Sequence, residues 1–499
     1  MKLTELTGAD APPSADRPAS DPDIAGLTAD SRAVRPGFLF AALVGARCDG
    51  RHFAGEAAAR GAAAILTDDA AALDLSPQAR AAVAVVADPN PRRRLALMAA
   101  RFYGRQPGVV AAVTGTNGKT SVAHFTREIW TVAGRSAASL GTLGLVTPAG
   151  RRAGALTTPD PTTLHRDLAA LAACGIEHVA IEASSHGLAQ FRLDGLSVAA
   201  AAFTNLTRDH LDYHASLADY RAAKERLFTA LLAPGRPAVL NSDSGEFTRL
   251  AGLCRERSHP VLAYGAEPAA KLRLVSARPR GRGQDLATEI FGRRHELFLP
   301  LLGEFQAMNA LAALGLALAT GVPLEAGIAA LATLSGVPGR LQFVAQNEGG
   351  GGVVVDYAHT PDALATVLAA LRPHAPGRLA VLFGAGGDRD PGKRPLMGRV
   401  AAGAADRVYV TDDNPRGEDP AAIRRAVLVA APDAVEIGDR RRAIETAIGE
   451  LGPGDLLVVA GKGHETGQIV GPETFPFDDA EIVREIAAGQ VPGRRRTGS

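Results

Sequence analysis

Short apolar runs alternate with helical segments along most of the chain. GVVAAV (108–113), HVAIE (178–182) and VAAAAFTN (198–205) contain the continuous apolar runs that are typical of strands covered on both faces. TSVAHFTREIWTVAG (120–134) follows the first run and has apolar residues at helical spacing up to a terminal glycine. Strands that alternate with helices in this way predict the α/β class, with a mostly parallel sheet.

Two clusters of proline and glycine divide this alternation into three parts. Pro107-Gly108 follows a small α/β region, and Pro338-Gly339 precedes a new series of strands. Each later strand ends in polar or glycine-rich residues: VVVDYAH (353–359), RLAVLFGAGG (378–387), DRVYVTDD (406–413) and DLLVVAGKG (455–463). This pattern is typical of a Rossmann-like doubly wound sheet, whose ligands bind at the carboxyl ends of the strands. We therefore expect three domains, with the limits 1–107, 108–338 and 339–499.

The overall charge gives no general attraction to nucleic acid or to an anionic membrane. The 54 Lys and Arg residues nearly balance the 53 Asp and Glu residues, for a formal net charge of +1. The first residues combine acidic groups with prolines and lack the apolar run of a signal peptide. The apolar stretch 310–334 is interrupted by Gly321 and Pro323, which favours two core helices over a membrane span. Three widely separated cysteines indicate no disulfide framework, and we expect a cytoplasmic protein.

A glycine-rich turn between a predicted strand and a predicted helix has the features of a phosphate-binding loop. It reads Thr114-Gly115-Thr116-Asn117-Gly118-Lys119-Thr120-Ser121. The glycines let the backbone approach a ligand, Lys119 can reach the terminal phosphates of a nucleotide, and Thr120 can ligate Mg²⁺. Val113 stands where the strict P-loop pattern has its first glycine, and a glycine turn with an incidental lysine is the alternative. We predict an ATP site in a central P-loop ATPase-type parallel sheet.

Two more candidate metal ligands follow predicted strands. Glu182 ends the strand HVAIE, and His210 follows the strand that contains Thr204 and Asn205. Taken singly, a glutamate at a strand end is often a solvated carboxylate, and a lone histidine is more often structural than a ligand. Because parallel strands end at the same edge of a sheet as the phosphate loop, their placement favours Mg²⁺ ligation together with Thr120.

Several motifs in order resemble the Mur ligase family. In the centre these are TGTNGKTS (114–121), EASSHGL (182–188), TNLTRDHLDYH (204–214) and YRAAKERLF (220–228). Outside it they are DSRAVRPGFLFAALVGARCDGRHF (30–53), DYAHTP (356–361), FGAGGDRDPGKRP (383–395) and AGKGHE (460–465). The second group is similar to the members that add the third residue of the muramyl peptide.

The resemblance implies a monomeric ATP-dependent amide-bond ligase with a domain each for the UDP end, ATP and the amino acid. It implies ATP, Mg²⁺, UDP-linked muramyl dipeptide and meso-diaminopimelate as cofactors and substrates. ATP contacts are expected from Gly115, Thr116, Asn117, Gly118, Lys119, Thr120, Ser121, Asn309, Arg340 and Asp356. The muramyl dipeptide is expected at Ala29, Ser31, Thr157, Thr158, Ser184, Gln190 and Arg192, with residues 46–48 near its UDP portion.

Lys224 has a special expected role. In this family the lysine of the Y-x-x-A-K-x-x-L-F pattern is carbamylated by CO₂, and Lys224 occupies that position. The modification converts a cation into a carboxylate-like anion that can ligate or position Mg²⁺. A surface lysine paired with a nearby acid is the alternative. The resemblance therefore implies catalytic roles for Lys119, Lys224, Glu182 and His210.

One loop in the expected third domain bears on which amino acid is added. Asp413-Asn414-Pro415-Arg416 resembles the motif of the diaminopimelate-adding members. A guanidinium can form a bidentate pair with the distal carboxylate of diaminopimelate, which lysine lacks, so an unsatisfied arginine would reject lysine. The resemblance also implies contacts from Arg389, Gly461 and Glu465. A turn arginine that only faces solvent is the alternative for Arg416.

Three other functions stay open at this point. A lysine-adding ligase of the same family differs at the D-N-P-R motif, and a folylpolyglutamate synthetase resembles the central domain but not the N-terminal DSR segment. The third is a nucleotide-dependent switch that binds ATP without ligation.

Overall fold

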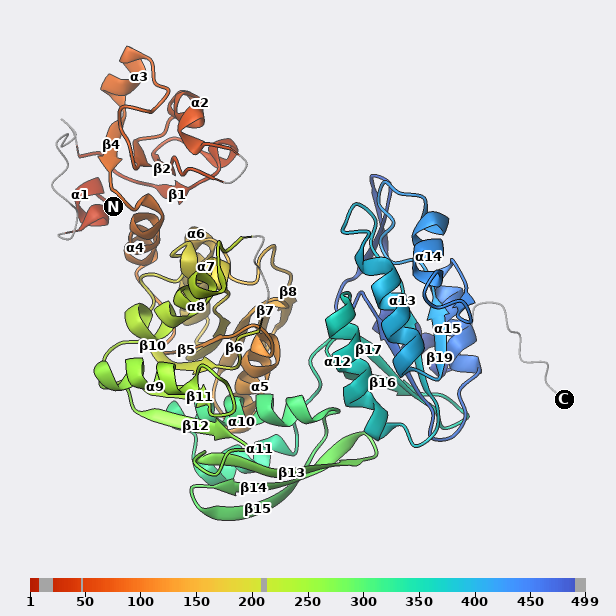
Figure 1. Ribbon diagram of the computed structural model, residues 1–499. Coiled ribbons are helices and arrows are strands. Elements are labelled where there is room, and N and C mark those ends of the chain that lie inside the picture. Colours follow the sequence, from red (N-terminus) through yellow and green to blue (C-terminus); the bar gives the residue numbers. More distant parts are fainter. Residues whose placement is uncertain (9–20, 46–47, 208–212, 490–499) are drawn as a thin grey trace. The chain divides into compact units, whose positions relative to one another are not determined.

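The computed structural model describes residues 1–8, 21–45, 48–207 and 213–489. Its contacts divide the chain into two compact units, Met1–Ala263 with Gly315–Pro323, and Tyr264–Leu314 with Leu324–Ser499. Each unit contains parallel strands and helices that alternate along the chain (Figure 1), so the predicted α/β class is confirmed. The three domain limits drawn from the sequence stay predictions.

The N-terminal part of the first unit is a four-stranded parallel sheet. Its strands follow one another in space as in sequence: β1 (Gly26–Thr28), β2 (Phe38–Ala41), β3 (Ala64–Thr67) and β4 (Ala84–Ala87). The helices of this part are α1 (Leu3–Thr7), α2 (Ala54–Ala59), α3 (Pro77–Ala82) and α4 (Pro91–Tyr103). Leu39 of β2 packs with Met98 of α4, whereas the next residue, Phe40, packs with Ala54 of α2. This alternation buries both faces of the sheet.

The larger sheet of the first unit carries the phosphate loop. Within this unit the spatial order is β11 (Ala238–Asn241), β10 (Val198–Phe203), β5 (Val109–Thr114), β9 (His178–Glu182), β6 (Ala137–Gly141), β7 (Gly144–Thr147) and β8 (Gly150–Arg152). The first five strands are parallel, and β7 and β8 are antiparallel. The accompanying helices are α5 (Lys119–Val132), α6 (Pro161–Ala173), α7 (Ser185–Ala189), α8 (Leu217–Arg226), the π-helical η3 (Leu227–Leu231) and α9 (Phe247–Glu256).

The strand register places the functional candidates at one edge of this sheet. Thr114 of β5 lies opposite Phe203 of β10, and Val113 lies opposite Glu182 of β9. The loop after β5 therefore begins between the ends of its two neighbours. Parallel pairing brings these chain segments together although they are far apart in sequence.

The second unit begins with an antiparallel extension that the sequence analysis did not predict. It consists of β13 (Leu272–Arg280), β14 (Gly283–Ile290) and β15 (Arg293–Leu299), and β12 (Val261–Gly265) precedes it. Arginines stand among the apolar residues of β13 and β15, which obscures the alternation that would mark a half-buried strand.

A second parallel sheet forms the rest of this unit. Its spatial order is β16 (Gln342–Gln346), β17 (Gly352–Asp356), β21 (Leu456–Ala460), β18 (Leu379–Phe383), β19 (Arg407–Val410) and β20 (Val435–Glu436), and β16 alone is antiparallel. Val354 faces the core shared with α12 (Pro361–Leu371), α13 (Lys393–Ala404) and α14 (Pro420–Leu428). Val353 and Val355 face the core shared with α15 (Arg440–Gly449) and α16 (Asp479–Ala487). Helices on both faces confirm the Rossmann-like pattern.

The apolar stretch 310–334 forms two helices, as predicted. These are α10 (Glu304–Ala319) and α11 (Leu324–Leu331), and the turn between them contains Gly321 with φ 92°. In the described parts of the chain, no helix combines the length and apolar character that a membrane crossing requires.

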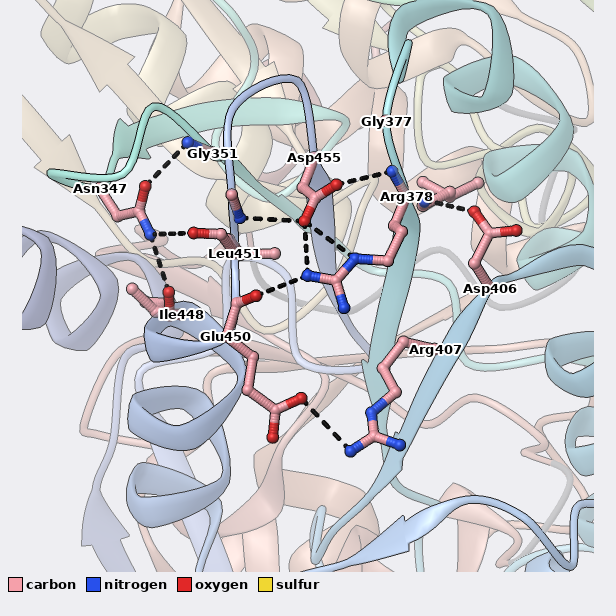
Figure 2. Close-up of polar contacts among 12 residues, drawn as sticks. Asn347, Gly351, Gly377, Arg378, Asp406, Arg407, Ile448, Glu450, Leu451 and Asp455 are labelled. Carbon is pink, nitrogen blue, oxygen red and sulfur yellow. Dashed lines mark hydrogen bonds and ion pairs between the residues drawn. The ribbon is translucent and has the colours of Figure 1, made fainter.

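A polar cluster fixes the loops that enter the strands of the second sheet (Figure 2). Asp455, just before β21, accepts hydrogen bonds from the Arg378 backbone N–H (2.7 Å), its Nη2 (2.7 Å) and the Gly452 N–H (3.0 Å). Nη2 of Arg378 also donates to the Glu450 carbonyl at 2.6 Å, and Asn347 Nδ2 donates to the Leu451 carbonyl at 3.0 Å. These contacts lie at the amino ends of the strands, away from the edge where ligands are expected.

Replacing Asp455 tests this cluster. Asp455→Ala removes the buried acceptor of hydrogen bonds from Arg378 and Gly452, so we expect the free energy of unfolding to fall by about 2 kcal/mol at neutral pH. Urea unfolding of the full chain should be followed by circular dichroism, since the single tryptophan, Trp130, lies in the first unit. Arg441→Ala, which breaks an exposed ion pair with Glu485, is the control and should change stability little.

The pKa of Asp455 predicts how the stability difference between wild type and Asp455→Ala depends on pH. Burial raises the pKa of Asp455, but hydrogen bonds from Arg378 and Gly452 outweigh it and lower the pKa below the model-compound value of 3.8. A depressed folded pKa adds stability above the unfolded pKa and loses it as the pH falls through the folded pKa. The difference between wild type and Asp455→Ala should therefore be largest near neutral pH and shrink on acidification below about 3.8. A difference that grows in acid would contradict this role.

Candidate functional site

The phosphate loop joins β5 to α5, and its conformation depends on two glycines. Gly118 precedes α5 with a left-handed φ of 86°, and Gly115 has φ 148°. A Cβ atom at Gly115 would lie 1.9 Å from Oγ1 of Thr204, so only glycine fits at this approach to the end of β10. Because α5 begins at Lys119, its first N–H groups and its dipole favour a phosphate at the loop.

The segment after β10 fixes the phosphate loop by direct hydrogen bonds. The Asn117 N–H donates to Oδ1 of Asn205 at 2.9 Å, and the Thr204 hydroxyl donates to the Asn117 carbonyl at 2.6 Å. The Thr116 hydroxyl lies 3.1 Å from the Tyr220 hydroxyl. Asn205 and Tyr220 are thus part of the site, although the sequence analysis gave them no role of their own.

Two lysine ammonium groups meet at the Gly115 carbonyl. Nζ of Lys119 donates to this oxygen at 2.9 Å, and Nζ of Lys224 donates to it at 2.6 Å. Lys224 is 2% exposed, and its Nζ lies 4.4 Å from the centre of the Tyr220 ring. Two cations thus share one oxygen acceptor, and the negative charge of a bound phosphate would be attracted to both.

The Glu182 carboxylate lies beside the start of α5. Its Oε1 accepts from the Thr142 N–H at 2.7 Å, and its Oε2 accepts from the Thr120 hydroxyl at 2.9 Å. A Cβ atom at Gly141 would lie 2.1 Å from Oε1, so the glycine leaves room for the carboxylate. Thr142 was not predicted, although it directly follows the apolar run of β6 and the rule that found Glu182 applies to it.

These oxygen atoms fit a magnesium ion. Mg²⁺ in phosphate sites prefers one or two protein oxygens and takes its other ligands from water and phosphate. Thr120 and Glu182 offer a hydroxyl and a carboxylate 2.9 Å apart. Among the residues that the structure describes, no cluster of three or more His, Cys, Asp or Glu side chains could hold a metal by itself. His210 lies outside the described residues.

Four predicted muramyl-dipeptide residues form one hydrogen-bonded network at the end of β9. The Thr158 hydroxyl donates to the Glu182 carbonyl at 2.7 Å and lies 2.9 Å from the Ser184 hydroxyl. Arg192 donates to the Thr158 carbonyl and to Oε1 of Gln190, both at 2.7 Å. The network therefore shares Glu182 with the oxygen pair described above.

A cavity of about 290 Å³ adjoins this network. Pro159 and Asp160, which follow Thr158, line it together with residues of β6, β7 and α6. Arg152 and Asp167, two other lining residues, form an ion pair. The remaining predicted residue of the loop, Thr157, lies with its hydroxyl 3.2 Å from that of Thr142.

The two N-terminal candidates follow β1 in a separate sheet. Ser31 is buried and its hydroxyl donates to Oε2 of Glu56 at 3.1 Å, whereas Ala29 is exposed. Of the expected neighbours 46–48, residues 46–47 lie outside the described residues, and Cys48 is exposed.

In the second unit, the residues predicted for ATP, Asn309, Arg340 and Asp356, each contact a different residue. The Leu341 N–H donates to Oδ2 of Asp356 at 2.7 Å, and the Arg340 guanidinium lies 4.7 Å from the centre of the Tyr357 ring. Burial raises the pKa of Asp356, and the N–H donors oppose the increase. Asn309 donates to Oε1 of Gln306 at 2.9 Å. Asp356 thus orders the backbone here, and its contact with ribose stays a prediction.

The loop that contains Arg416 lies at the carboxyl ends of β19 and β21. We call residues 413–417 the Arg416 loop. Arg416 has a left-handed φ of 50°, and its Nη1 donates to the carbonyls of Gly387 (2.9 Å) and Asn414 (3.4 Å). A Cβ atom at Gly386 would lie 2.9 Å from this Nη1. Because the glycines after β18 have no side chains, they leave room for the guanidinium of Arg416.

The other predicted amino-acid contacts surround this loop. Nδ2 of Asn414 donates to Oε2 of Glu465 at 3.1 Å, and a Cβ atom at Gly461 would lie 2.7 Å from Oδ2 of Asp413. Pro415 is buried. Arg389 is exposed, and its Nη1 donates to the Asp388 carbonyl at 3.4 Å. The structure therefore groups Asp413, Asn414, Gly461 and Glu465 tightly and leaves Arg389 at the surface.

Comparison with known proteins gives the same family as the motifs. Sequence models match in three stretches: "Mur ligase family, catalytic domain" at 23–103, "Mur ligase middle domain" at 113–317 and "Mur ligase, glutamate ligase domain" at 339–463. A protein of Caulobacter vibrioides named "UDP-N-acetylmuramoyl-L-alanyl-D-glutamate--2,6-diaminopimelate ligase" is 53% identical over 94% of this chain and 96% of its own. This chain belongs to the Mur ligase family. A Bradyrhizobium diazoefficiens protein of the same name is 51% identical over 98% of this Mur ligase and all of its own length.

Solved Mur ligases share the fold. A structure of a UDP-N-acetylmuramoyl-L-alanyl-D-glutamate--2,6-diaminopimelate ligase has a TM-score of 0.73 and 33% identity, and covers 98% of this chain and 99% of its own. A Mur ligase from Thermotoga maritima in complex with ADP has a TM-score of 0.61 at 19% identity, covering 93% of this chain and 97% of its own. This second likeness concerns the fold alone.

Gly115→Ala tests the phosphate loop. The added Cβ would collide with Thr204 at a backbone conformation that favours glycine, so we expect binding of Mg·ATP to weaken at least about tenfold. The measurement is the nucleotide-dependent shift in the unfolding temperature of the purified protein. Gly108→Ala, where a Cβ would meet nothing within 4 Å, is the matched control. Equal shifts for both variants would contradict a nucleotide at this loop.

Proposed function

We propose that this Mur ligase joins meso-diaminopimelate to the D-Glu carboxylate of UDP-N-acetylmuramoyl-L-alanyl-D-glutamate at the expense of ATP. The observation that carries the proposal is the identity of about half the residues, over nearly the whole chain, with ligases named for these substrates. The site geometry supports it, because the phosphate loop and the Arg416 loop each lie at the carboxyl ends of the parallel strands of their sheet. We place the reaction in the cytoplasm and expect a monomer.

The first step activates the acceptor. An oxygen of the D-Glu side-chain carboxylate attacks the γ-phosphorus of ATP, the bond to the β-phosphate oxygen breaks, and ADP leaves an acyl phosphate. Lys119 and the N–H groups of the loop stabilise the charge on the transferred phosphoryl group. Mg²⁺, held by Thr120 and Glu182, would neutralise phosphate charge when bound. The network of Thr158, Ser184, Gln190 and Arg192, with the adjoining cavity, binds and orients the muramyl dipeptide.

The second step forms the amide. The neutral amine of diaminopimelate attacks the acyl carbon, the amine loses its proton, and inorganic phosphate leaves with the carbon–oxygen bond. The carboxylates of Asp413 and Glu465 offer charge complementary to an ammonium group of the amino acid. No side chain needs to act as a nucleophile, because the phosphate is the leaving group.

Selection of the amino acid rests on Arg416. Its Nη1 is held by two carbonyls, and a guanidinium has further N–H groups that can donate to the distal carboxylate of diaminopimelate. Lysine cannot supply that carboxylate, which disfavours the lysine-adding alternative. A folylpolyglutamate synthase from Mycobacterium tuberculosis shares the fold with a TM-score of 0.60, but its 20% identity supports no common substrate.

An amino-acid panel tests the function. Purified protein, Mg·ATP and UDP-muramyl dipeptide should release phosphate with meso-diaminopimelate and give little release with lysine or glutamate. Phosphate release that does not depend on the two acceptor substrates would favour an ATP-dependent switch instead.

Arg416→Ala tests the selection. We expect the KM for diaminopimelate to rise about a hundredfold, because the variant loses a charge-assisted bidentate pair, while the KM for ATP stays the same. Arg425→Ala on α14, which removes an exposed ion pair with Asp419, is the control. Unchanged kinetics for diaminopimelate would refute the role of Arg416.

We also propose that Lys224 carries a carbamate. Its Nζ is buried and shares the Gly115 carbonyl with Lys119. The ammonium group first loses a proton, and the neutral amine then reacts with CO₂ to form an N–C bond and release a second proton, so that a negative charge replaces the positive one. The change would place an anion beside the Lys119 ammonium group at the phosphate loop.

Lys224→Ala tests the carbamate. The variant should lose most activity and regain part of it when a short carboxylic acid such as acetate is added, because the acid can replace the missing anion. Lys271→Ala, at an exposed lysine, serves as the control. Full activity of Lys224→Ala without added acid would remove the carbamate from the mechanism.

A further inference from the structure

The chain that follows β21 runs along the Arg416 loop and forms hydrogen bonds with it. We call residues 461–471 the β21 tail; it includes β22 (Gly467–Val470), which pairs with β23 (Glu473–Pro476) in a two-stranded hairpin. Both the side chains and the backbone of the tail contribute to these bonds, and two of its side chains, Lys462 and Gln468, have no role in the reaction described above.

Lys462 is the most deeply buried member of the tail. It is 0% exposed, and its Nζ donates to Oδ1 of Asn414 at 3.0 Å and lies 3.6 Å from Oε2 of Glu465. Burial lowers the pKa of Lys462, while Asp413 and Glu465 oppose this effect. A fully buried lysine is rare and costs stability unless it is paired. Lys462 lies between Asn414 and Glu465, two predicted amino-acid contacts, and can hold both in place.

The Asn414 side chain is held from three directions. Its Oδ1 accepts from Nζ of Lys462 and from the Ile469 N–H at 2.9 Å, and its Nδ2 donates to Glu465 at 3.1 Å. An amide side chain with both ends bonded cannot rotate without breaking these contacts. Lys462 therefore fixes the distance between the Arg416 loop and Glu465.

The hairpin holds the backbone of the same loop. Nε2 of Gln468 donates to the Asp413 carbonyl at 2.7 Å. The Arg416 N–H donates to the Ile469 carbonyl at 3.1 Å, and the Gly471 N–H donates to the Arg416 carbonyl at 2.7 Å. A left-handed conformation disfavours any residue with a Cβ, and Arg416 keeps it because both of its backbone polar groups are bonded to the hairpin.

We propose that Lys462 and Gln468 are positioning residues that hold the Arg416 loop in the conformation that binds the incoming amino acid. The inference rests on the proposed function, since it concerns the same amino-acid site. Lys462 acts through Asn414, and Gln468 acts through the Asp413 carbonyl. Neither residue has to touch the substrate: each keeps the guanidinium of Arg416 and the carboxylates of Asp413 and Glu465 at matching positions.

Two variants remove one contact each. Lys462→Met keeps an unbranched apolar chain in the buried space and removes the ammonium group, and Gln468→Leu removes the donor to Asp413 on the partly exposed hairpin. For each, we expect the KM for diaminopimelate to rise about tenfold while kcat falls less than about threefold. The KM values for ATP and UDP-muramyl dipeptide should stay within about twofold, and relative turnover of lysine should increase.

Asp455→Asn is the matched control. Asp455 stabilises the same sheet at the amino ends of its strands, where it accepts hydrogen bonds from Arg378 and Gly452. A variant that only destabilises the second unit should lower the unfolding temperature of the protein and leave the KM for diaminopimelate unchanged. A rise in this KM for the control equal to that for the two test variants would show a general stability effect and overturn the positioning role.

The outcomes separate the two proposals. The wild type is first assayed with the amino-acid panel, and a preference for an amino acid other than diaminopimelate would overturn the proposed function; the variants are then assayed with that amino acid. If the wild type uses diaminopimelate and both variants keep its KM, the positioning role alone is wrong. Should Lys462→Met fail to fold, as judged by circular dichroism, the result for Gln468→Leu decides.

Discussion

Parallel strands end at one edge of their sheet, and both candidate sites depend on this constraint. In the first unit, the pairing of β5 with β9 and β10 places the phosphate loop between Glu182 and Thr204. In the second, the pairing of β21 with β18 and β17 places the β21 tail next to the glycines after β18 and to Asp356. Helices α5 and α8 supply Lys119 and Lys224, but helical periodicity by itself does not bring these two side chains to one site. The sheet order brings them together, and glycines at the crowded points allow it.

Charge is concentrated at these edges and balanced locally. The Gly115 carbonyl accepts from two lysines, whereas the Arg416 loop combines Asp413, Arg416 and, through Asn414, the buried Lys462 and Glu465. Because the whole chain has a formal net charge of only +1, the phosphate and carboxylate affinities that we propose for the two sites have to come from these local arrangements and not from a general field.

Stability and function are separated along the strands of the second unit. The cluster around Asp455 and Arg378 satisfies backbone groups at the amino ends (Figure 2), and the Arg416 loop lies at the carboxyl ends. The buried pair of Arg440 and Asp479 also lies at the carboxyl end of β21, since Nη2 of Arg440 donates to the carbonyl of Ala460, the last residue of that strand. We therefore expect substitutions at the amino ends to change folding with little effect on chemistry.

The sequence by itself determined the α/β class, the phosphate loop and the strand-end position of Glu182, because these follow from local apolar runs and from glycines next to a lysine. It also placed the helices of 310–334 correctly. Only the tertiary structure decided that Thr142 bonds Glu182, that Lys119 and Lys224 share one carbonyl, and that Lys462 and Gln468 hold the Arg416 loop. It also showed the antiparallel β13–β15 extension, whose charged residues obscure the strand pattern. Contacts of this kind join residues that are distant along the chain, and no local spacing encodes them; they exist because the sheet order fixes which strand ends become neighbours.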